Sequence, residues 1–362
     1  MKILWINANP NPNPGGTEAH SIDFINAIEK IPDIQIYKAV AKGSYVDKHT
    51  SNKNKFYITL KSEFSPLNTF KLIKLAKQIK PDVIIGNNGN EYINTFLAGK
   101  FAGSKVVLFR HMLNRQPFFI KKFIFPNVDK IIAVSESSKR RLILDSVQES
   151  KIEVLPNFID EEKFNFNPEE KREIRKKLNI GDDEIVISFL GKVAEGKGIF
   201  DFYNISNILA KKSKKFRFLV IGYGRDLEKI KKMVQENDIS DRYIFTDKTD
   251  TPHIFLKASD ILLALSKGEE SFGRVVIEGF ATKNLVIVYN VENLKYLVKD
   301  GETGFICNVA DINCVVSNII KVIENKNLFE FIKENGYREF IENYIKEKVI
   351  NRFLKILPEV VR

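Results

Sequence analysis

Short apolar runs alternate along the chain with longer stretches whose apolar positions recur at helical spacing. The apolar runs have the length of buried strands, which we expect at 3–7, 83–86, 106–109, 130–134, 185–190, 216–221, 243–246, 261–265 and 286–288. The stretches between them predict helices at 68–80, 135–147, 199–211, 226–237 and 274–281. Strands that alternate with helices are typical of α/β proteins with parallel sheets.

A charged segment near the middle of the chain divides these strands and helices into two series. Glu161–Asp183 contains Pro168 and many charges, and a second series of apolar runs follows it. The 362 residues are about two domains' worth of chain. We therefore expect two doubly wound domains, at 1–165 and 166–339, that face a cleft and bind ligands at the carboxyl ends of their strands. The last stretch, 340–362, looks helical.

Composition excludes several classes of protein. Hydrophobic residues make up 44% and charged residues 28%, as in ordinary soluble proteins rather than disordered ones. No apolar run approaches the roughly 20 residues that span a bilayer, and the run at the start is too short for a signal peptide. Cys307 and Cys314 predict no disulfide framework, and the four scattered histidines show no metal-ligand spacing. A reducing, cytoplasmic location fits these features.

The net charge of +11 is unevenly distributed. Residues 1–160 carry +9 and residues 161–362 carry +2. Such a field favours an anionic partner, which could be nucleic acid, an anionic membrane or a phosphorylated substrate.

Two glycine-containing loops follow the first strands of the two halves. Pro14–Glu18 includes Gly15 and Gly16 and opens a helix, so it suits a phosphate, although a merely flexible loop is the alternative. In the second half, Lys192 and Lys197 lie on a loop where both could neutralise a diphosphate. The alternative for them is two solvated surface lysines.

The most specific motif runs from Glu270 to Glu278. Ser271 and Gly273 mark the start of a helix, whose free N–H groups suit a diphosphate. Glu278 can accept hydrogen bonds from ribose hydroxyls, and Glu270 can orient a sugar hydroxyl. Taken alone, the two glutamates could equally lie on an ordinary helix surface.

These motifs, in this order, resemble glycosyltransferase family 4, which comprises retaining transferases with the GT-B fold of two Rossmann-like domains. The resemblance rests on Gly-Gly-Thr-Glu at 15–18, Arg110-His111, and the segments 132–137, 154–160, 191–198, 270–278 and 300–305. It implies that the second domain holds a nucleotide-sugar donor and the first an acceptor. It also implies that the final helix, 340–362, packs back on the first domain.

Position by position, the resemblance implies catalytic and donor-binding residues. The catalytic set is Glu270, Lys197, Lys192 and His111, and the donor-binding set is Gly15, Gly16, Ser271, Phe272, Gly273, Arg274 and Glu278. Lys192 stands where the family usually has arginine, and it keeps the charge without the bidentate geometry. His111 would lie near the transferred sugar.

One segment departs from the family pattern. Where the family commonly has Gly-Gly, this chain has Glu292 and Asn293, so a loop near the donor is altered. The chain has no Asp-x-Asp triplet, and we expect neither an obligatory metal nor a cofactor besides a UDP- or GDP-linked donor.

The expected function is retaining transfer of a hexose or N-acetylhexosamine to a glycan or lipid-linked acceptor, in cell-surface polysaccharide or lipopolysaccharide synthesis. The alternative is a nucleotide-sugar epimerase or hydrolase on the same GT-B fold. Nucleic-acid binding is suggested by charge alone, and no recognition motif supports it.

Two stretches supply much of the N-terminal charge. Residues 70–80 predict an amphipathic helix with several lysines, and residues 115–125 mix aromatic and basic side chains. Both could lie on the inner face of an anionic membrane. For 70–80, core packing with solvated lysines is an equal alternative, whereas 115–125 leans toward the membrane.

Overall fold

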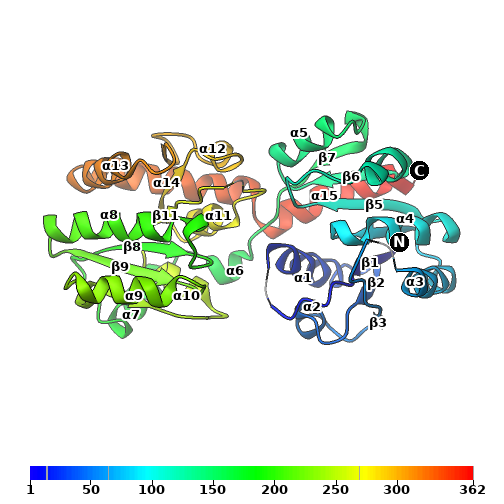
Figure 1. The fold of residues 1–362 in the computed structure, drawn as a ribbon, viewed down its shortest axis with the longest axis horizontal. Coiled ribbons are helices and arrows are strands. Elements are labelled where there is room, and N and C mark those ends of the chain that lie inside the picture. Colours follow the sequence, from blue (N-terminus) through cyan, green and yellow to red (C-terminus); the bar gives the residue numbers. More distant parts are fainter. Residues whose placement is uncertain (14, 64, 269, 362) are drawn as a thin grey trace. The chain divides into compact units, whose positions relative to one another are not determined.

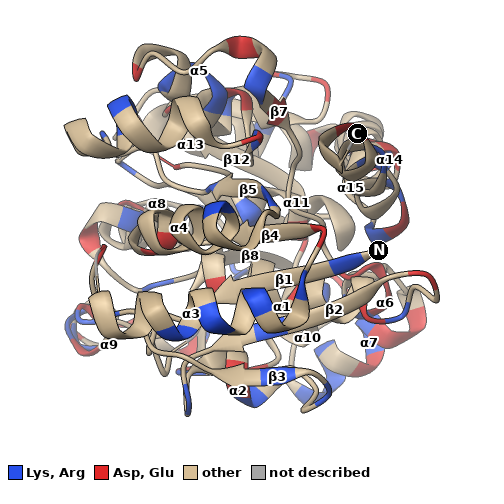
Figure 2. Cartoon of the chain, turned by 90° about the vertical axis from the view of Figure 1, so that its right-hand side faces the viewer, with Lys and Arg blue, Asp and Glu red and all other residues tan. Residues whose placement is uncertain are grey.

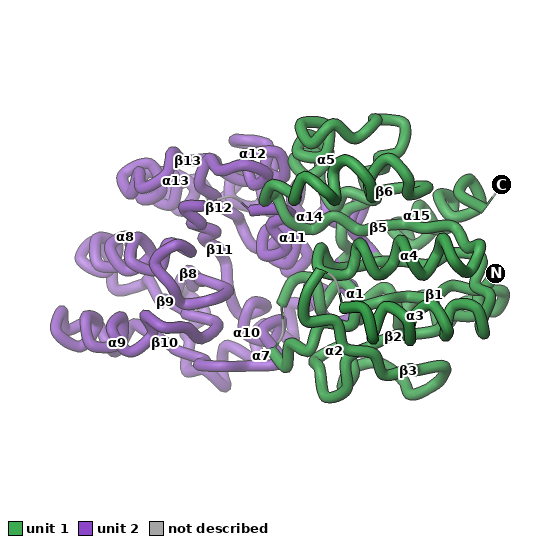
Figure 3. The backbone as a smooth tube through the Cα atoms, turned by 45° about the vertical axis from the view of Figure 1, so that its right-hand side comes forward, with its two compact units in different colours: residues 1–158, 346–362 green, residues 159–345 purple. Residues whose placement is uncertain are grey.

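The computed structural model describes the chain except for residues 14, 64, 269 and 362, and it divides into two compact units (Figure 3). Unit 1 comprises residues 1–158 and 346–362, and unit 2 comprises residues 159–345. Each unit is built on one parallel sheet with helices between its strands. The predicted α/β class with two Rossmann-like domains is therefore confirmed.

Unit 1 has a seven-stranded sheet in the order β3-β2-β1-β4-β5-β6-β7 (Figure 1). Its strands are β1 (Lys2–Asn7), β2 (Gln35–Val40), β3 (Lys55–Tyr57), β4 (Val83–Gly86), β5 (Lys105–Arg110), β6 (Lys130–Ala133) and β7 (Ile152–Val154). Its α-helices are α1 (Gly16–Ile28), α2 (Tyr45–His49), α3 (Pro66–Ile79), α4 (Tyr92–Ala102), α5 (Glu136–Leu144) and α15 (Lys346–Val361).

Unit 2 has a six-stranded sheet in the order β10-β9-β8-β11-β12-β13. Its strands are β8 (Ile185–Leu190), β9 (Phe216–Ile221), β10 (Tyr243–Phe245), β11 (Ile261–Ala264), β12 (Leu285–Tyr289) and β13 (Gly304–Cys307). Its helices are α6 (Glu161–Phe164), α7 (Pro168–Lys177), α8 (Ile199–Lys212), α9 (Leu227–Glu236), α10 (Pro252–Lys257), α11 (Arg274–Ala281), α12 (Leu294–Leu297), α13 (Ile312–Glu324) and α14 (Lys326–Asn343).

Strand β1 shows how the sheet of unit 1 is buried on both faces. Leu4 and Ile6 pack into a core cluster with residues of α3, including Leu72. Trp5 points to the opposite face, where its ring lies 5.5 Å from Phe109 and 6.5 Å from Phe353 of α15. Neighbouring side chains in a strand alternate between faces, so one apolar run supplies both cores.

The boundaries between the units differ from the predicted ones. Residues 159–165 belong to unit 2 rather than to the first domain, because the backbone N–H of Ile159 donates to the Tyr344 carbonyl at 3.1 Å. Helix α14 continues to Asn343, so residues 340–345 also belong to unit 2. Only α15, shown in red among the N-terminal elements in Figure 1, packs with unit 1.

The expectation for the cysteines was wrong. Cys307, at the end of β13, forms a disulfide with Cys314 in the first turn of α13. The turn between β13 and α13 brings their Cα atoms to 5.8 Å, a contact that seven-residue spacing alone did not reveal.

Within the described residues, no helix combines the length and the apolar character needed to cross a bilayer.

Candidate active site

Three loops of unit 2 meet beyond the carboxyl ends of β8, β9 and β11, and glycines make this close approach possible. A Cβ atom on Gly222 would lie 2.1 Å from the carbonyl oxygen of Gly191. Gly198, with a φ of +83°, approaches the carbonyl oxygen of Leu265 equally closely, at 2.2 Å from an added Cβ. The loops that carry the predicted lysines and the first glutamate are therefore packed on one another.

Lys197 and Glu270 come together from two of these loops. The Lys197 ammonium donates a hydrogen bond to Oε1 of Glu270, and the Ser266 hydroxyl donates to the same oxygen at 2.6 Å. The side chains of Lys197 and Glu270 are 43% and 21% exposed. An ammonium has three donors and a carboxylate two oxygens, so one contact exhausts neither group. Lys192 is exposed on the same loop as Lys197.

The other donor-binding candidates of unit 2 lie at the start of α11. Ser271, Phe272 and Gly273 precede this helix, whose first N–H groups have no partners within it. Such a terminus stabilises an anion. Within the helix, Arg274 Nε donates to Glu278 Oε1 at 2.9 Å, and Glu278 is buried. The Glu278 carboxylate is thus held in place by its neighbour one turn earlier.

The segment that departs from the family pattern shapes this helix start. Gly273 has a φ of +83°, and a Cβ there would lie 2.5 Å from Leu294 Cδ2. Asn293 has a φ of 75° and a ψ of −46°, a conformation outside the left-handed helical region that residues with side chains rarely adopt. Its side-chain amide donates to the carbonyl oxygen of Phe272. Asn293 therefore adopts a glycine-like backbone and ties the altered loop to the start of α11.

A polar network that the sequence did not suggest supports the Glu270 loop. Asp201, buried in the first turn of α8, accepts from Lys267 Nζ at 2.9 Å and from the Tyr289 hydroxyl at 2.8 Å. Burial, with the Asp201 carboxylate, raises the pKa of Tyr289, so its hydroxyl stays a donor. These residues are far apart in the sequence and follow no recognisable spacing.

In unit 1, His20, Asn87 and His111 meet from α1 and from the loops after β4 and β5. Asn87 Oδ1 lies 3.0 Å from His20 Nδ1 and 3.1 Å from His111 Nε2. The amide nitrogen of Asn87 donates to the Thr17 carbonyl at 3.2 Å, so Oδ1 faces both rings. An amide oxygen only accepts, and both ring nitrogens must therefore carry hydrogen. Asn87 and His20 were not among the predicted site residues.

His111 is electrically neutral in this setting. Burial, together with the positive charge of Arg110, lowers the pKa of His111 to about 3. With hydrogen on Nε2, the neutral ring presents Nδ1 as a hydrogen-bond acceptor. Arg110 is buried and donates to the backbone and side-chain oxygens of Asn114. Of the predicted pair, Arg110 therefore has a structural role, whereas His111 can accept a hydrogen bond through Nδ1.

Gly15 and Gly16 lie at the N-terminus of α1, after β1. Gly16 is the first residue of the helix, and a Cβ there would meet nothing within 4 Å. Space is therefore open beside Gly16, whereas the buried carboxylate of Glu18, in the first turn, lies against Gly15, 2.4 Å from an added Cβ. Pro14, from the same predicted loop, lies outside the described residues.

Glu91 reinforces the strand ends beside this cluster. Its carboxylate accepts from the backbone N–H groups of Ala8 at 2.6 Å and Asn88 at 3.0 Å. Complete burial raises the pKa of Glu91 to about 7, against the opposing effect of these donors.

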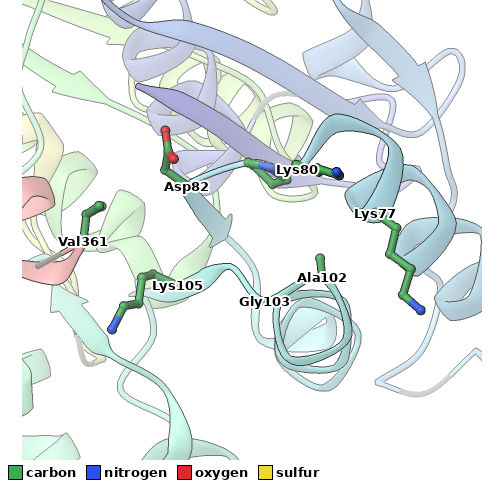
Figure 4. A pocket seen from close by; sticks show the side chains of 8 residues that line it. Lys77, Lys80, Asp82, Ala102, Gly103, Lys105 and Val361 are labelled. Carbon is green, nitrogen blue, oxygen red and sulfur yellow. The ribbon is translucent and has the colours of Figure 1, made fainter.

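A hollow of about 580 Å³ in unit 1 lies at the opposite edge of the sheet (Figure 4). Asp82 and Lys105 line it near the amino ends of β4 and β5, together with Lys77 of α3 and Lys80, which follows that helix. These side chains point in different directions in Figure 4 and do not converge on one place. No predicted site residue lines this hollow.

Two family models match the chain, one after the other. Residues 15–163 match the model described as Glycosyltransferase Family 4, and residues 170–339 match the model described as Glycosyl transferases group 1. The chain belongs to the family 4 glycosyltransferases. The resemblance drawn from the motifs is confirmed by these matches, which together include most of the chain.

Individual relatives of this family 4 glycosyltransferase agree with that assignment. The capsular polysaccharide biosynthesis glycosyltransferase CapM of Staphylococcus aureus is 31% identical over 247 residues, 62% of either chain. A glycosyltransferase from Rickettsia africae has a TM-score of 0.87 at 20% identity, covering 100% of this chain and 98% of that one. HepE of Anabaena, solved with UDP, has a TM-score of 0.82 at 17% identity, covering 99% and 100%. The two structures show that the fold is GT-B.

Among the described residues, no group of three or more His, Cys, Asp or Glu side chains is arranged to hold a metal ion.

Proposed function

We propose that this glycosyltransferase moves a hexose or N-acetylhexosamine from a UDP- or GDP-linked donor to a glycan or lipid-linked acceptor, with retention of configuration and without a metal ion or other cofactor. The observation that carries the proposal is the meeting of Lys197, Ser266 and Glu270 at the carboxyl edge of the unit 2 sheet. The polysaccharide function in the name of the staphylococcal relative, and the UDP bound to HepE, support this class of donor and product.

Each residue has a definite task in this proposal. Lys192, Lys197 and the first N–H groups of α11 stabilise the negative charge that grows on the leaving diphosphate. Glu270 binds hydroxyls of the transferred sugar, and Glu278 binds those of the ribose. The leaving phosphate takes the proton of the acceptor hydroxyl as that oxygen attacks from the same face of the sugar.

Unit 1 contributes three further contacts in this proposal. Gly15 and Gly16 approach the donor phosphates, because two successive residues without side chains let the backbone come close. His111 accepts a hydrogen bond from a sugar hydroxyl through Nδ1. The acceptor belongs to cell-surface polysaccharide or lipopolysaccharide synthesis, at the inner face of an anionic membrane that unit 1 contacts. No observation favours an epimerase or hydrolase, which would convert the donor without any acceptor.

Substitutions of the ion pair test this assignment. We expect Lys197→Ala and Glu270→Ala each to lower kcat for transfer at least about 100-fold, as the loss of a single transition-state contact commonly does. Initial-rate measurements with a panel of UDP- and GDP-sugars give the comparison, and thermal unfolding checks that the variants stay folded. Lys214→Ala, in the turn after α8, is a matched control that should keep normal turnover. Near-normal turnover in either site variant would contradict the assignment.

A further inference from the structure

An aromatic surface of unit 1 has no place in the transfer chemistry. The side chains of Phe118, Phe119 and Phe123 are 69%, 51% and 46% exposed. They lie on or just before the π-helix η2 (Ile120–Ile124), whose Ile120 and Ile124 are buried in the core. The spacing of four residues places the two isoleucines on the inner side, while the rings of Phe119 and Phe123 lie outside, tilted to each other, with their centres 5.0 Å apart. Solvent exposure of three neighbouring phenylalanines is unusual unless they bind something.

The cations around these rings have few acidic neighbours. Lys122 Nζ lies 5.4 Å from the centre of the Phe118 ring and 5.6 Å from that of Phe123. No Asp or Glu occurs between Glu91 and Asp129, so neither α4, on which η2 packs, nor η2 itself carries a negative charge. Lys121 pairs with Asp145 at 3.7 Å, which leaves Lys122 as the cation in contact with the rings, and Arg115, three residues before Phe118, is also exposed.

We infer that Phe118, Phe119, Phe123 and Lys122 form a docking surface for an anionic lipid bilayer. Phenyl rings gain free energy on entering the region between headgroups and acyl chains, and a lysine beside them can reach the lipid phosphates. The positive charge selects an anionic membrane over a neutral one. We infer the docking surface from these contacts alone. Its use to reach a lipid-linked acceptor rests on the proposed function.

The other basic stretch, α3, differs in that most of its apolar side chains belong to the core. Its apolar side chains Leu72, Leu75, Ala76 and Ile79 are buried, and Figure 2 shows its Lys positions in blue along the helix. Core packing thus explains most of the helix. Its exposed Leu67 and Phe70, at the first turn, offer a second apolar pair of similar exposure for comparison.

Vesicle co-sedimentation of the full chain tests the docking surface. We expect binding to phosphatidylcholine vesicles that contain 30% phosphatidylglycerol, and little binding to phosphatidylcholine alone. Phe118→Ala/Phe119→Ala/Phe123→Ala should weaken binding at least about tenfold, and Lys122→Ala about fivefold, in keeping with one lysine's share of the attraction. Added salt should weaken the binding of the unchanged chain.

Matched variants and a second readout decide the outcome. Leu67→Ala/Phe70→Ala should bind the anionic vesicles normally. The triple phenylalanine variant should also transfer sugar to a soluble acceptor normally, which separates a failure of docking from a failure of the proposed function. Equal and negligible binding to both vesicles, or loss caused by the α3 pair rather than by the phenylalanines, would overturn the inference. Negligible vesicle binding would instead indicate that this surface binds an acidic protein.

Discussion

At the scale of single residues, the structure assigns hydrogen positions that the sequence cannot specify. His111 stood in the sequence as one histidine after a predicted strand. Its contact with Asn87, whose amide is oriented by the Thr17 carbonyl, makes Nε2 the donor and Nδ1 the acceptor. A neutral His111 can therefore bind a sugar hydroxyl but cannot act as an acid near neutral pH.

The protonation state of His111 can be measured directly. Between pH 5 and 8 we expect the ¹⁵N NMR resonances of His111 to show hydrogen on Nε2 and none on Nδ1, without a titration step. The reason is that its pKa lies near 3, while an unfolded histidine titrates near 6.5. The lowered pKa also means that folding stability contributed by neutral His111 is present above pH 6.5 and is lost as the pH falls below it.

A substitution at Asn87 gives the matching comparison. In Asn87→Leu the amide oxygen is lost, and we expect the ¹⁵N resonances of His111 to shift while those of the remote His253, in unit 2, stay unchanged. An unaltered His111 spectrum in this variant would show that Asn87 does not set the tautomer.

At the scale of elements, helix starts and strand ends carry the candidate chemistry. In unit 2, helices α8, α9 and α11 were predicted to within one or two residues, whereas α10, α12, α13 and α14 were not predicted. Strand β2 was missed, because its Lys38 interrupts the apolar run. The structure buries Lys38 completely and pairs it with Glu29 at 2.8 Å. Burial lowers the pKa of Lys38, and its hydrogen bond with Glu29 opposes that effect. Strands β3, β7 and β13 were also missed, although β4 and β10, which are equally short, were predicted.

The start of α11 depends on the backbone of Gly273. We expect Gly273→Ala to lower the free energy of unfolding of unit 2 by about 1–3 kcal/mol, because alanine at positive φ is strained and its Cβ would press on Leu294. Urea unfolding measures this change. Gly196→Ala is the matched control, since a Cβ there meets nothing within 4 Å, and its stability should be normal or slightly higher. Equal stability of the two variants would argue against a strained helix start.

At the scale of the whole molecule, both sheets place their candidate residues where the strand order reverses. In unit 1 the chain leaves β1 toward β2 on one side and resumes at β4 on the other, and in unit 2 the corresponding strands are β8 and β11. Gly16 and Asn87 follow β1 and β4, while Lys197 and Glu270 follow β8 and β11. Loops diverge at such a point and leave room for a ligand, so both units use the same position of the α/β fold.

Unit 1 is assembled from two segments far apart in the sequence, and this can be tested. Phe353 of α15 packs 5.5 Å from Phe24 and 6.1 Å from Phe109. We expect Phe353→Ala to destabilise unit 1 by about 3–5 kcal/mol, the usual cost of removing a buried phenyl ring. Calorimetry should show one thermal transition lowered and the transition of unit 2 unchanged. Phe331→Ala, on the exposed side of α14, should alter neither transition, and a joint shift of both would count against separate units.

The sequence alone determined the fold class, the family and the loops that carry the candidate site, because these depend on local periods and on motifs within ten residues. Tertiary structure alone decided which side chains meet. Lys197 with Glu270, Asp201 with Tyr289, and Asn87 with His111 are joined by the order of strands in a sheet, and that order cannot be read from spacing. It also decided the disulfide, which depends on the turn between β13 and α13, and the unit boundaries, which depend on where distant backbone segments return. The physical reason is the same throughout: local propensity sets each element, whereas burial and hydrogen-bond partners are set by what the fold brings alongside it.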